Sequence, residues 1–273
     1  MSSNSPNKRW ATLRKFDFGG ANNLGITLML ENGTGRSAIR KQLRPLQMGR
    51  DLGNEVDVME KLAGHPNIVQ IYDFVPASGE TFNRHELYVE YCKVLVRGQE
   101  VNTIHELSQF YTPKQKEVPE LFVWHLYEGL MRALAYMHLG IRSLVDDLYS
   151  CNVFLSSKGA YSKTIKSCSE YPRIVVGDFG LSDTASRSQT YFRRSLATGC
   201  ERSPCRTNLD ISAVYEMLEL FGHENSKELQ NMMRPLHDLR DGSPEILTLL
   251  KDLVTTKKRL VGEGKLKFEP LLQ

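Results

Sequence analysis

A short apolar run that ends in an acidic residue is the first feature of this sequence that could do chemistry. Residues 175–177 read Val-Val-Gly, and Asp178, Phe179 and Gly180 follow directly. We expect a buried strand over the apolar run, so that Asp178 faces a crevice at the end of that strand. Carboxylate oxygens hold Mg²⁺ at such places, and a glycine lets the chain turn sharply. A tight surface turn is the alternative interpretation, because such tripeptides also occur by chance.

A second acidic stretch lies upstream of the first. Asp147 precedes Asn152 by five residues, and a short apolar run at 153–155 follows. In phosphoryl transfer one carboxylate accepts the proton of the substrate hydroxyl, and an amide oxygen helps to hold a metal ion. This spacing fits a catalytic base and a metal ligand. An acidic turn capped by asparagine is the alternative.

Taken together, the two motifs resemble the catalytic loop and the Asp-Phe-Gly motif of eukaryotic protein kinases. The resemblance implies that Asp147 is the base and that Asn152 and Asp178 are the magnesium ligands. The stretch 54–69 reads NEVDVMEKLAGHPNIV and resembles the C-helix of the family and its exit, the most specific signal in the chain. Glu55 then stands where the family has the glutamate that pairs with its phosphate-binding lysine.

The hinge of the family is matched at residues 87–92, which read LYVEYC. By this resemblance Val89 is the gatekeeper, and backbone groups of Glu90 and Cys92 face adenine. All three residues therefore belong to the expected ATP site.

Two further pieces occur in the family order. Residues 133–138 resemble the end of the long helix before the catalytic loop, and residues 214–218 resemble the buried helix after the activation segment. The resemblance implies an α+β, bilobal protein-kinase-like fold. A small β-rich N-lobe with one main helix would precede a larger, mostly helical C-lobe. Asp210 is the candidate for the buried anchor aspartate of that lobe.

The hydrophobic pattern agrees with this division. Two apolar runs flank the turn residues 32–35 and predict a hairpin, and a helical pattern runs from Leu52 to Ala63. A strong helix opens at Pro119. Further helices are expected near 211–221, 227–239 and 244–254. We expect a disordered N-terminus at 1–12, the N-lobe at 13–92, and the C-lobe, with a shortened activation segment, at 93–273.

The phosphate loop of the family has the pattern G-x-G-x-x-G-x-V, in which glycines let the backbone approach the phosphates. Here Gly20 and Gly25 match the first and third glycines, whereas Asn22 replaces the second and Thr27 replaces the valine. An ordinary glycine-bearing turn is the alternative interpretation.

The phosphate-binding lysine fits the sequence in two registers. Counting from Ala38 puts Arg40 at its position, whereas Lys41 is the lysine of the pair. We prefer Lys41, because it shares a strand face with Ile39 and Leu43, and Ile39 then also belongs to the nucleotide site. A lysine point charge and an arginine fork are not equivalent, so an inward Arg40 would count against catalysis.

The catalytic loop departs from the family pattern H-R-D-L-K-P-x-N. Val145 and Asp146 replace the His and the Arg, so switching through an arginine-bound phosphate is not expected. Tyr149 replaces the lysine that neutralises the transferred phosphate, and losing such a cation costs on the order of a few kcal/mol of transition-state stabilisation. The Ala-Pro-Glu element of the substrate platform is reduced to a remnant at 203–205.

Three functional hypotheses follow from these residues. The leading hypothesis is an ATP-dependent phosphotransferase that moves the γ-phosphate to a protein hydroxyl, Ser or Thr rather than Tyr, with ATP and Mg²⁺ as cofactors. The alternative is a catalytically impaired pseudokinase that serves as a nucleotide-binding or protein-interaction scaffold. A kinase fold that acts on a small molecule is a third possibility. Salt-bridge distance between Lys41 and Glu55 would favour activity.

The composition excludes several other classes. Apolar residues make up 41% and charged residues 25%, as in ordinary globular proteins. The net charge of +3 and the scattered basic residues give no support to nucleic-acid binding, and the basic run 257–259 is expected on a solvated helix face. The five cysteines form no CxxC pair, which favours a reducing compartment. No apolar run is long enough to cross a membrane and no signal core begins the chain, so we expect an intracellular protein, cytoplasmic or nuclear.

Overall fold

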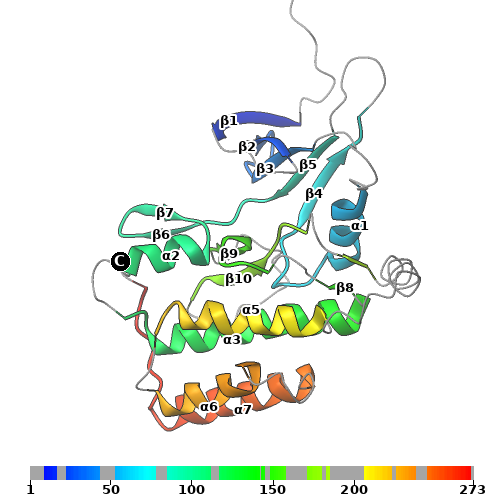
Figure 1. The fold of residues 1–273 in the computed structure, drawn as a ribbon. Helices are drawn as coiled ribbons and strands as arrows, with labels where there is room; N and C mark the ends of the chain where they lie inside the picture. Colours follow the sequence, from blue (N-terminus) through cyan, green and yellow to red (C-terminus); the bar gives the residue numbers. More distant parts are fainter. Residues whose placement is uncertain are drawn as a thin grey trace, which may run out of the picture. The chain divides into compact units, whose positions relative to one another are not determined.

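The computed structural model describes the chain at residues 9–16, 23–43, 53–77, 85–111, 117–141, 143–144, 148–157, 171–179, 183–184, 206–222, 226–237 and 245–271. The chain divides into two compact units. Unit 1 comprises residues 1–63 and 69–91, and unit 2 comprises residues 64–68 and 92–273. In its described residues, unit 1 has a sheet and one helix, whereas those of unit 2 are mostly helical (Figure 1). The α+β class and the bilobal kinase-like fold expected from the sequence are therefore confirmed.

Unit 1 is built on an antiparallel sheet of five strands in the order β1-β2-β3-β5-β4. The strands are β1 (Trp10–Phe16), β2 (Asn23–Glu31), β3 (Ser37–Leu43), β4 (Ile71–Val75) and β5 (His85–Glu90). β2 and β3 form the predicted hairpin. Gly33 and Gly35 in its turn have φ values of 90° and 70°, which glycine adopts at no steric cost.

β1 begins at Trp10, inside the stretch 1–12 that was expected to be disordered, so that expectation is wrong from Trp10 onward. The cause is a long-range contact. The Trp10 ring stacks on Tyr88 of β5 with centroids 5.0 Å apart, and its Nε1 donates to Asp73 of β4 at 3.3 Å. Trp10, Met29, Ala38 and Tyr88 together form a small buried cluster on one face of the sheet.

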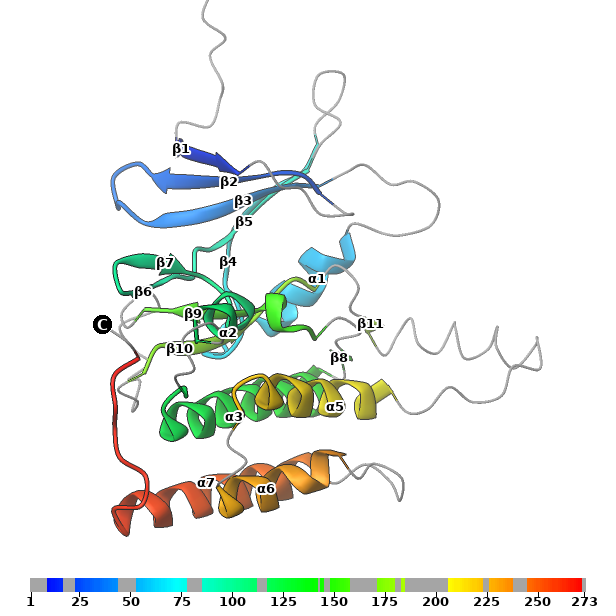
Figure 2. The same ribbon diagram turned by 60° about the vertical axis from the view of Figure 1, so that its left-hand side comes forward.

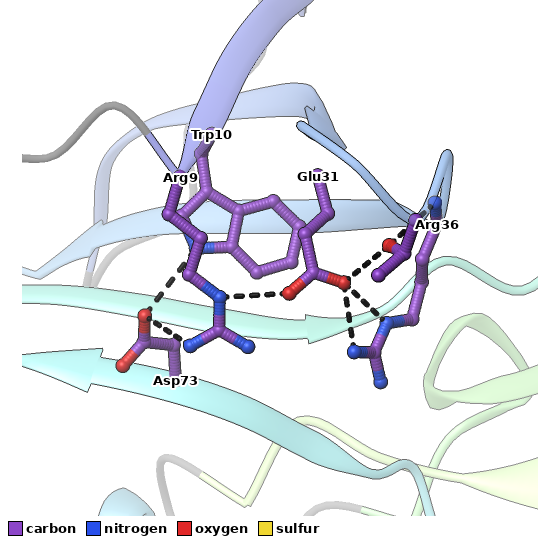
Figure 3. Close-up of polar contacts among 6 residues, drawn as sticks. Arg9, Trp10, Glu31, Arg36 and Asp73 are labelled. Carbon is purple, nitrogen blue, oxygen red and sulfur yellow. Dashed lines mark hydrogen bonds and ion pairs between the residues drawn. The ribbon is translucent and has the colours of Figure 1, made fainter.

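A polar network lies beside Trp10 (Figure 3). Glu31, which is buried, accepts hydrogen bonds from Thr34 Oγ1 at 2.6 Å, Arg9 Nε at 2.7 Å and Arg36 Nη2 at 2.7 Å. The Thr34 hydroxyl, with Arg9 and Arg36, lowers the pKa of Glu31 to about 2 against the opposing effect of burial. Arg9 also reaches Asp73 at 3.1 Å. The network therefore joins the start of β1 to both β2 and β4.

The helix of unit 1 is α1 (Gly53–Leu62). Its buried face carries Val56, Met59 and Leu62 at three-residue steps, as the helical pattern of the sequence predicts. Gly64 ends the helix region with φ 91°. A residue in this left-handed conformation cannot continue the helix, which is why α1 stops here.

From residue 92 onward, the described residues of unit 2 form helices and three two-stranded sheets. Its parts are β6 (Val94–Val96), β7 (Gln99–Val101), α2 (Ile104–Tyr111), α3 (Glu120–Ala135), the π-helical η3 (Tyr136–Ile141), β8 (Ser143–Leu144), the 3₁₀ turn η4 (Ser150–Asn152), β9 (Val153–Ser156), β10 (Arg173–Val176), β11 (Asp183–Thr184), α5 (Arg206–Glu219), α6 (Lys227–His237) and α7 (Ile246–Gly262). The predicted helices near 211–221, 227–239 and 244–254 correspond to α5, α6 and α7.

Helix α3 is the centre of unit 2. It contacts α5, α7 and β10, and α6 packs on α5, so that the four helices form two layers (Figure 2). The predicted apolar positions Val123, Leu126 and Leu130 are fully buried. Gly129 lies directly against Ile174 of β10, where an added Cβ would stand 2.7 Å from the Ile174 Cβ. The absence of a side chain at Gly129 therefore sets the approach of the strand to the helix.

The basic run 257–259 lies on α7, as predicted, and Lys258 and Arg259 are exposed. Lys257 pairs with Glu128 of α3 at 3.0 Å, and Arg259 pairs with Glu263 at 3.0 Å. Two of the three cations thus have acidic partners within unit 2. Among the residues that the structure describes, no helix combines the length and the apolar character that a membrane crossing requires.

Candidate active site

An ion pair inside unit 1 joins β3 to α1. Lys41 Nζ lies 2.8 Å from Glu55 Oε1, and the two side chains are 13% and 7% exposed. Little water reaches the pair, so the attraction between the two charges is screened less than at a surface. The two residues that the sequence assigned to the phosphate clamp and its partner are therefore in contact.

Arg40 points to the other face of the sheet, because successive side chains of a strand alternate. Its Nη1 lies 3.1 Å from Glu86 Oε1, and its Nη2 donates to Thr27 Oγ1 at 3.3 Å. Ala38, on the same face as Arg40, is buried in the Trp10 cluster. Of the two registers that the sequence left open, the structure therefore has Lys41, and not Arg40, beside α1.

Ile39 and Val89 lie on the face of the sheet that carries Lys41. Ile39 is the cross-strand neighbour of Val89, and Lys41 is the neighbour of Leu87. Directly opposed residues in antiparallel strands point to the same side. Val89 is buried, and Ile39 is partly exposed. Two of the residues assigned to the nucleotide thus share a face with the ion pair.

The backbone of Glu90, in unit 1, and that of Cys92, in unit 2, are each held by a hydrogen bond. The Glu90 N–H donates to the Gln70 carbonyl at 2.8 Å. The Cys92 carbonyl accepts from Asn102 Nδ2 at 2.7 Å. These bonds use the amide of Glu90 and the carbonyl of Cys92, and both residues are buried.

The hairpin of β9 and β10 in unit 2 brings Asn152 and Asp178 to the same end. Val153 is opposite Val176, so the residues just outside this pair are neighbours as well. The Gly177 N–H donates to the Asn152 carbonyl at 3.0 Å. Asn152 is 8% exposed. The two residues that the sequence assigned to a metal ion therefore lie at the same end of this hairpin.

The backbone of Asp178 has φ 61°, in the left-handed region. A residue with a Cβ pays about 1–3 kcal/mol for such a conformation, which persists only where the surroundings fix it and which occurs often at functional sites. Phe179, the next residue, is fully buried and anchors the chain on that side. The strain at Asp178 is thus held by its neighbours.

The donors at this end of the hairpin suit magnesium. An amide oxygen and a carboxylate are hard oxygen ligands, and Mg²⁺ is usually bound by one or two carboxylates together with water and phosphate oxygens. Within the described part of the chain, no group of three or more His, Cys, Asp or Glu residues is placed to hold a metal ion.

Two of the predicted site residues lie outside the described residues, namely the candidate base Asp147 and the first loop glycine Gly20. Gly25 lies in β2, where an added Cβ would meet only Gln42 Oε1, at an ordinary 3.7 Å. Packing within unit 1 therefore gives no steric reason for a glycine at this position.

Tyr149, which replaces the lysine of the family, is 60% exposed, whereas Leu148 beside it is buried. The Tyr149 carbonyl accepts the Asn152 N–H at 2.8 Å. The described part of this loop, from Leu148 to Asn152, contains no cationic side chain. The neutralising charge that the family places here is therefore absent from these five positions.

His138 and Asp210 form a buried pair in unit 2. His138 Nε2 lies 2.8 Å from Asp210 Oδ2, with side-chain exposures of 6% and 2%. Asp210, the candidate anchor aspartate, is thus paired with a side chain of the π-helical η3. This contact between two buried side chains links η3 to α5 within unit 2.

Two residues of unit 2 that the sequence interpretation missed support strand β10, which leads to Asp178. Asn67 donates from Nδ2 to the Ile174 carbonyl at 2.8 Å, and Arg173 donates to the Pro66 carbonyl. Arg173 is a single charged residue at the start of an otherwise apolar strand. That isolation was the one signal in the sequence that pointed to it.

The chain is similar to known protein kinases. Residues 26–208, more than half of the chain, match the family model of the protein kinase domain. Glycogen synthase kinase 1 of Pyricularia oryzae is 35% identical over 95 residues, which amounts to 35% of this chain and 22% of that relative. The aligned region thus spans less than a quarter of the curated relative.

Proposed function

This chain belongs to the protein kinase family, and on that premise we propose that it transfers the γ-phosphate of ATP to a hydroxyl group of a protein. Serine and threonine are the preferred acceptors over tyrosine. Mg²⁺ is the metal cofactor. The observation that carries the proposal is the ion pair of Lys41 and Glu55 at 2.8 Å.

The ion pair supports activity because kinases need the strand lysine and the helix glutamate in contact. Glu55 holds the Lys41 ammonium group in one place, so that the lysine presents its remaining donors to the phosphates of ATP. A long, flexible lysine that lacked this partner would lose rotamer freedom on binding. The ion pair therefore fixes the Lys41 ammonium group in unit 1 before a nucleotide binds.

The adenine and the phosphates are assigned to residues that match the family. Ile39 and Val89 provide apolar contacts to the base, and the backbone of Glu90 and Cys92 recognises its edge. The Glu90 amide is bonded to the Gln70 carbonyl and the Cys92 carbonyl to Asn102, which holds the backbone of both residues in place. Gly20 and Gly25 let the backbone of the loop approach the phosphates.

The reaction is assigned to three residues of unit 2. Asp147 accepts the proton of the attacking hydroxyl. Asn152 and Asp178 hold Mg²⁺, which neutralises charge on the phosphates when it is bound. Most of the rate enhancement would come from positioning and electrostatic stabilisation, because phosphoryl transfer needs little covalent work from the protein.

The proposal is tested by incubating the purified protein with Mg-ATP and a generic protein substrate and following phosphate transfer by intact mass. Asp147→Asn serves as the matched control, because it keeps the size of the side chain and removes the base. We expect transfer by the wild type and its loss in the variant. Equal transfer by both proteins would remove Asp147 from the role of base.

A pseudokinase is the second candidate, and the exposed Tyr149 at the lysine position favours it. A tyrosine donates one hydrogen bond and carries no charge. Such a protein would bind Mg-ATP, with a rise in melting temperature, and would transfer no phosphate to any substrate tried. Tyr149→Lys separates the two candidates further, because a working kinase is expected to gain rate from the added cation.

A further inference from the structure

A buried arginine lies at the start of the strand that delivers Asp178. Arg173 is 9% exposed, and the other three residues of β10 are fully buried and apolar. A guanidinium remains charged in proteins, and it loses hydration when it is buried. An apolar residue would fill this position without that desolvation. The arginine is therefore expected to have a specific task.

The guanidinium connects three segments of unit 2. Nη1 donates to the Pro66 carbonyl at 2.5 Å, and Nη2 donates to Ser156 Oγ at 3.1 Å. Ser156 is the last residue of β9 and the cross-strand neighbour of Arg173. Pro66 belongs to the segment 64–68. Both of these acceptors are uncharged, so these two bonds depend on the direction of the planar fork and not on opposite charge.

The same segment supports β10 at two more points. Asn67 Nδ2 donates to the Ile174 carbonyl at 2.8 Å, and the Val176 N–H donates to the Asn67 carbonyl at 2.9 Å. Ile68 forms a parallel bridge with Val176. Since β9 pairs with the other edge, β10 is held on both sides along its length.

This support bears on Asp178, which follows β10 by two residues and has φ 61°. A residue other than glycine stays in that conformation only where the structure on both sides of it is fixed. Fully buried Phe179 fixes one side, and β10 fixes the other. If β10 loosens, Asp178 is expected to relax and to move its carboxylate away from Asn152.

We propose that Arg173 is a positioning residue for the magnesium ligands. Its fork fixes the segment 64–68 and the end of β9 onto β10, and β10 in turn holds Asp178 in the left-handed conformation beside Asn152. The inference rests on the proposed function, because it takes Asn152 and Asp178 as the residues that hold Mg²⁺. Arg173 acts through the strand and not by touching the nucleotide.

Three variants test this role. Arg173→Met keeps the apolar stem and removes the donors, whereas Arg173→Lys keeps a charge and one donor group. Arg259→Met is the matched control, because Arg259 is an exposed arginine of the same unit, paired with Glu263. Two quantities are measured for each protein. One is the affinity for ATP with Mg²⁺ and with EDTA, by calorimetry, and the other is hydrogen exchange in the peptide 173–179.

We expect wild type to bind ATP more tightly with Mg²⁺ than with EDTA. Arg173→Met is expected to lose about tenfold of this magnesium enhancement, the size typical of residues that orient metal ligands. Its affinity in EDTA and its melting temperature are expected to stay near those of wild type, and its exchange over 173–179 to rise. The magnesium enhancement of Arg173→Lys is expected to fall between those of wild type and Arg173→Met, and that of Arg259→Met is expected to match wild type.

A folded Arg173→Met that keeps the full magnesium enhancement would overturn the inference. So would an equal loss of affinity with Mg²⁺ and with EDTA, since that indicates a general structural role. If Arg173→Met does not fold, the same comparison on Arg173→Lys decides. If wild type binds no ATP, the proposed function fails, and hydrogen exchange alone then tests the anchoring of β10. A rise in exchange confined to 173–179 in Arg173→Met would support this anchoring, and unchanged exchange would refute it.

Discussion

Lys41 and Glu55 illustrate what a single pair of residues can and cannot contribute. A buried ion pair loses the hydration of both groups, so its net effect on stability is close to zero even when its geometry is good. At 2.8 Å and with exposures of 13% and 7%, this pair belongs to that class. Its value to the protein is therefore expected in the placement of the Lys41 ammonium group and not in the free energy of unfolding.

A double-mutant cycle tests this view of the pair. Glu55→Leu leaves the Lys41 charge without its helix partner, and we expect a loss of about 3–5 kcal/mol in the free energy of unfolding. Lys41→Met is expected to be costly for the same reason. The double variant should lose much less than the sum of the two, because it leaves neither charge buried.

The measurement is urea unfolding of the four proteins at one pH. Losses that simply add would contradict a coupled buried pair. In the intact-mass assay, all three variants are expected to lose phosphate transfer, including a double variant that is fully stable. Stability and activity would then separate at these two residues.

At the scale of elements, the periodic segments could be predicted from the sequence. The hairpin of β2 and β3 follows from two apolar runs around the turn 32–35, and α1 and α3 follow from apolar residues at helical steps. The local pattern of apolar residues is enough to predict the type and the approximate bounds of these elements. The start of β1 could not be predicted, because Trp10 is ordered by stacking on Tyr88, which is distant in sequence.

The residues of the candidate site also could be predicted only in part from the sequence. The sequence pointed to Glu55, Asn152 and Asp178 through motif spacing, and to Lys41 through the strand face that it shares with Ile39 and Leu43. In the structure Lys41 contacts Glu55, and Asn152 and Asp178 lie at one end of the β9–β10 hairpin. The preference for Lys41 over Arg40 rested on strand alternation alone, and the pairing of β3 with β5 fixes the register in which Lys41 lies on the α1 side. Arg173 could not be assigned a task from the sequence, since its partners lie on other segments.

The contact between α3 and β10 gives a prediction at this scale. In Gly129→Ala the new Cβ would lie 2.7 Å from the Cβ of Ile174, a β-branched residue with little freedom to move. Overpacking of this kind costs about 1–3 kcal/mol, and the higher helix propensity of alanine returns about 1 kcal/mol. We expect net destabilisation in urea unfolding, together with a weaker magnesium enhancement of ATP affinity.

Gly262→Ala is the control for that variant. Gly262 ends α7, and nothing lies within 4 Å of the position of an added Cβ. The substitution is therefore expected to be neutral or to stabilise the protein by up to about 1 kcal/mol. If both alanine variants changed stability in the same direction, the close approach of β10 to α3 would not be the reason for Gly129.

For the whole molecule, stability in acid depends on carboxylates that are charged and bonded in the folded state. The pKa of Glu31 is lowered to about 2 from an ordinary 4.5, chiefly by the Thr34 hydroxyl and then by Arg9 and Arg36. Because the folded pKa is the lower one, the unfolded chain binds the proton more readily. Glu31 therefore contributes stability that is present above about pH 4.5 and is lost as the pH falls toward 2.

We expect Glu31→Gln to remove this part of the pH dependence. The urea midpoint of wild type should fall between pH 4.5 and 2 more steeply than that of the variant. Glu60→Gln, at an exposed position of α1, is the control and should keep the wild-type slope. Parallel curves for wild type and Glu31→Gln would mean that the network in Figure 3 does not hold Glu31 ionised.

The contact between Trp10 and Asp73 also has a consequence for the order in which the protein is made. The two residues are separated by 63 positions, and β1 and β4 are the two outermost strands of the sheet. Long-range contacts of this kind form only after the intervening chain is available to close the loop. Trp10 is synthesised before its stacking partner Tyr88, so it cannot be buried against that ring until Tyr88 has emerged. We therefore expect this tryptophan to stay exposed during synthesis until β5 is available.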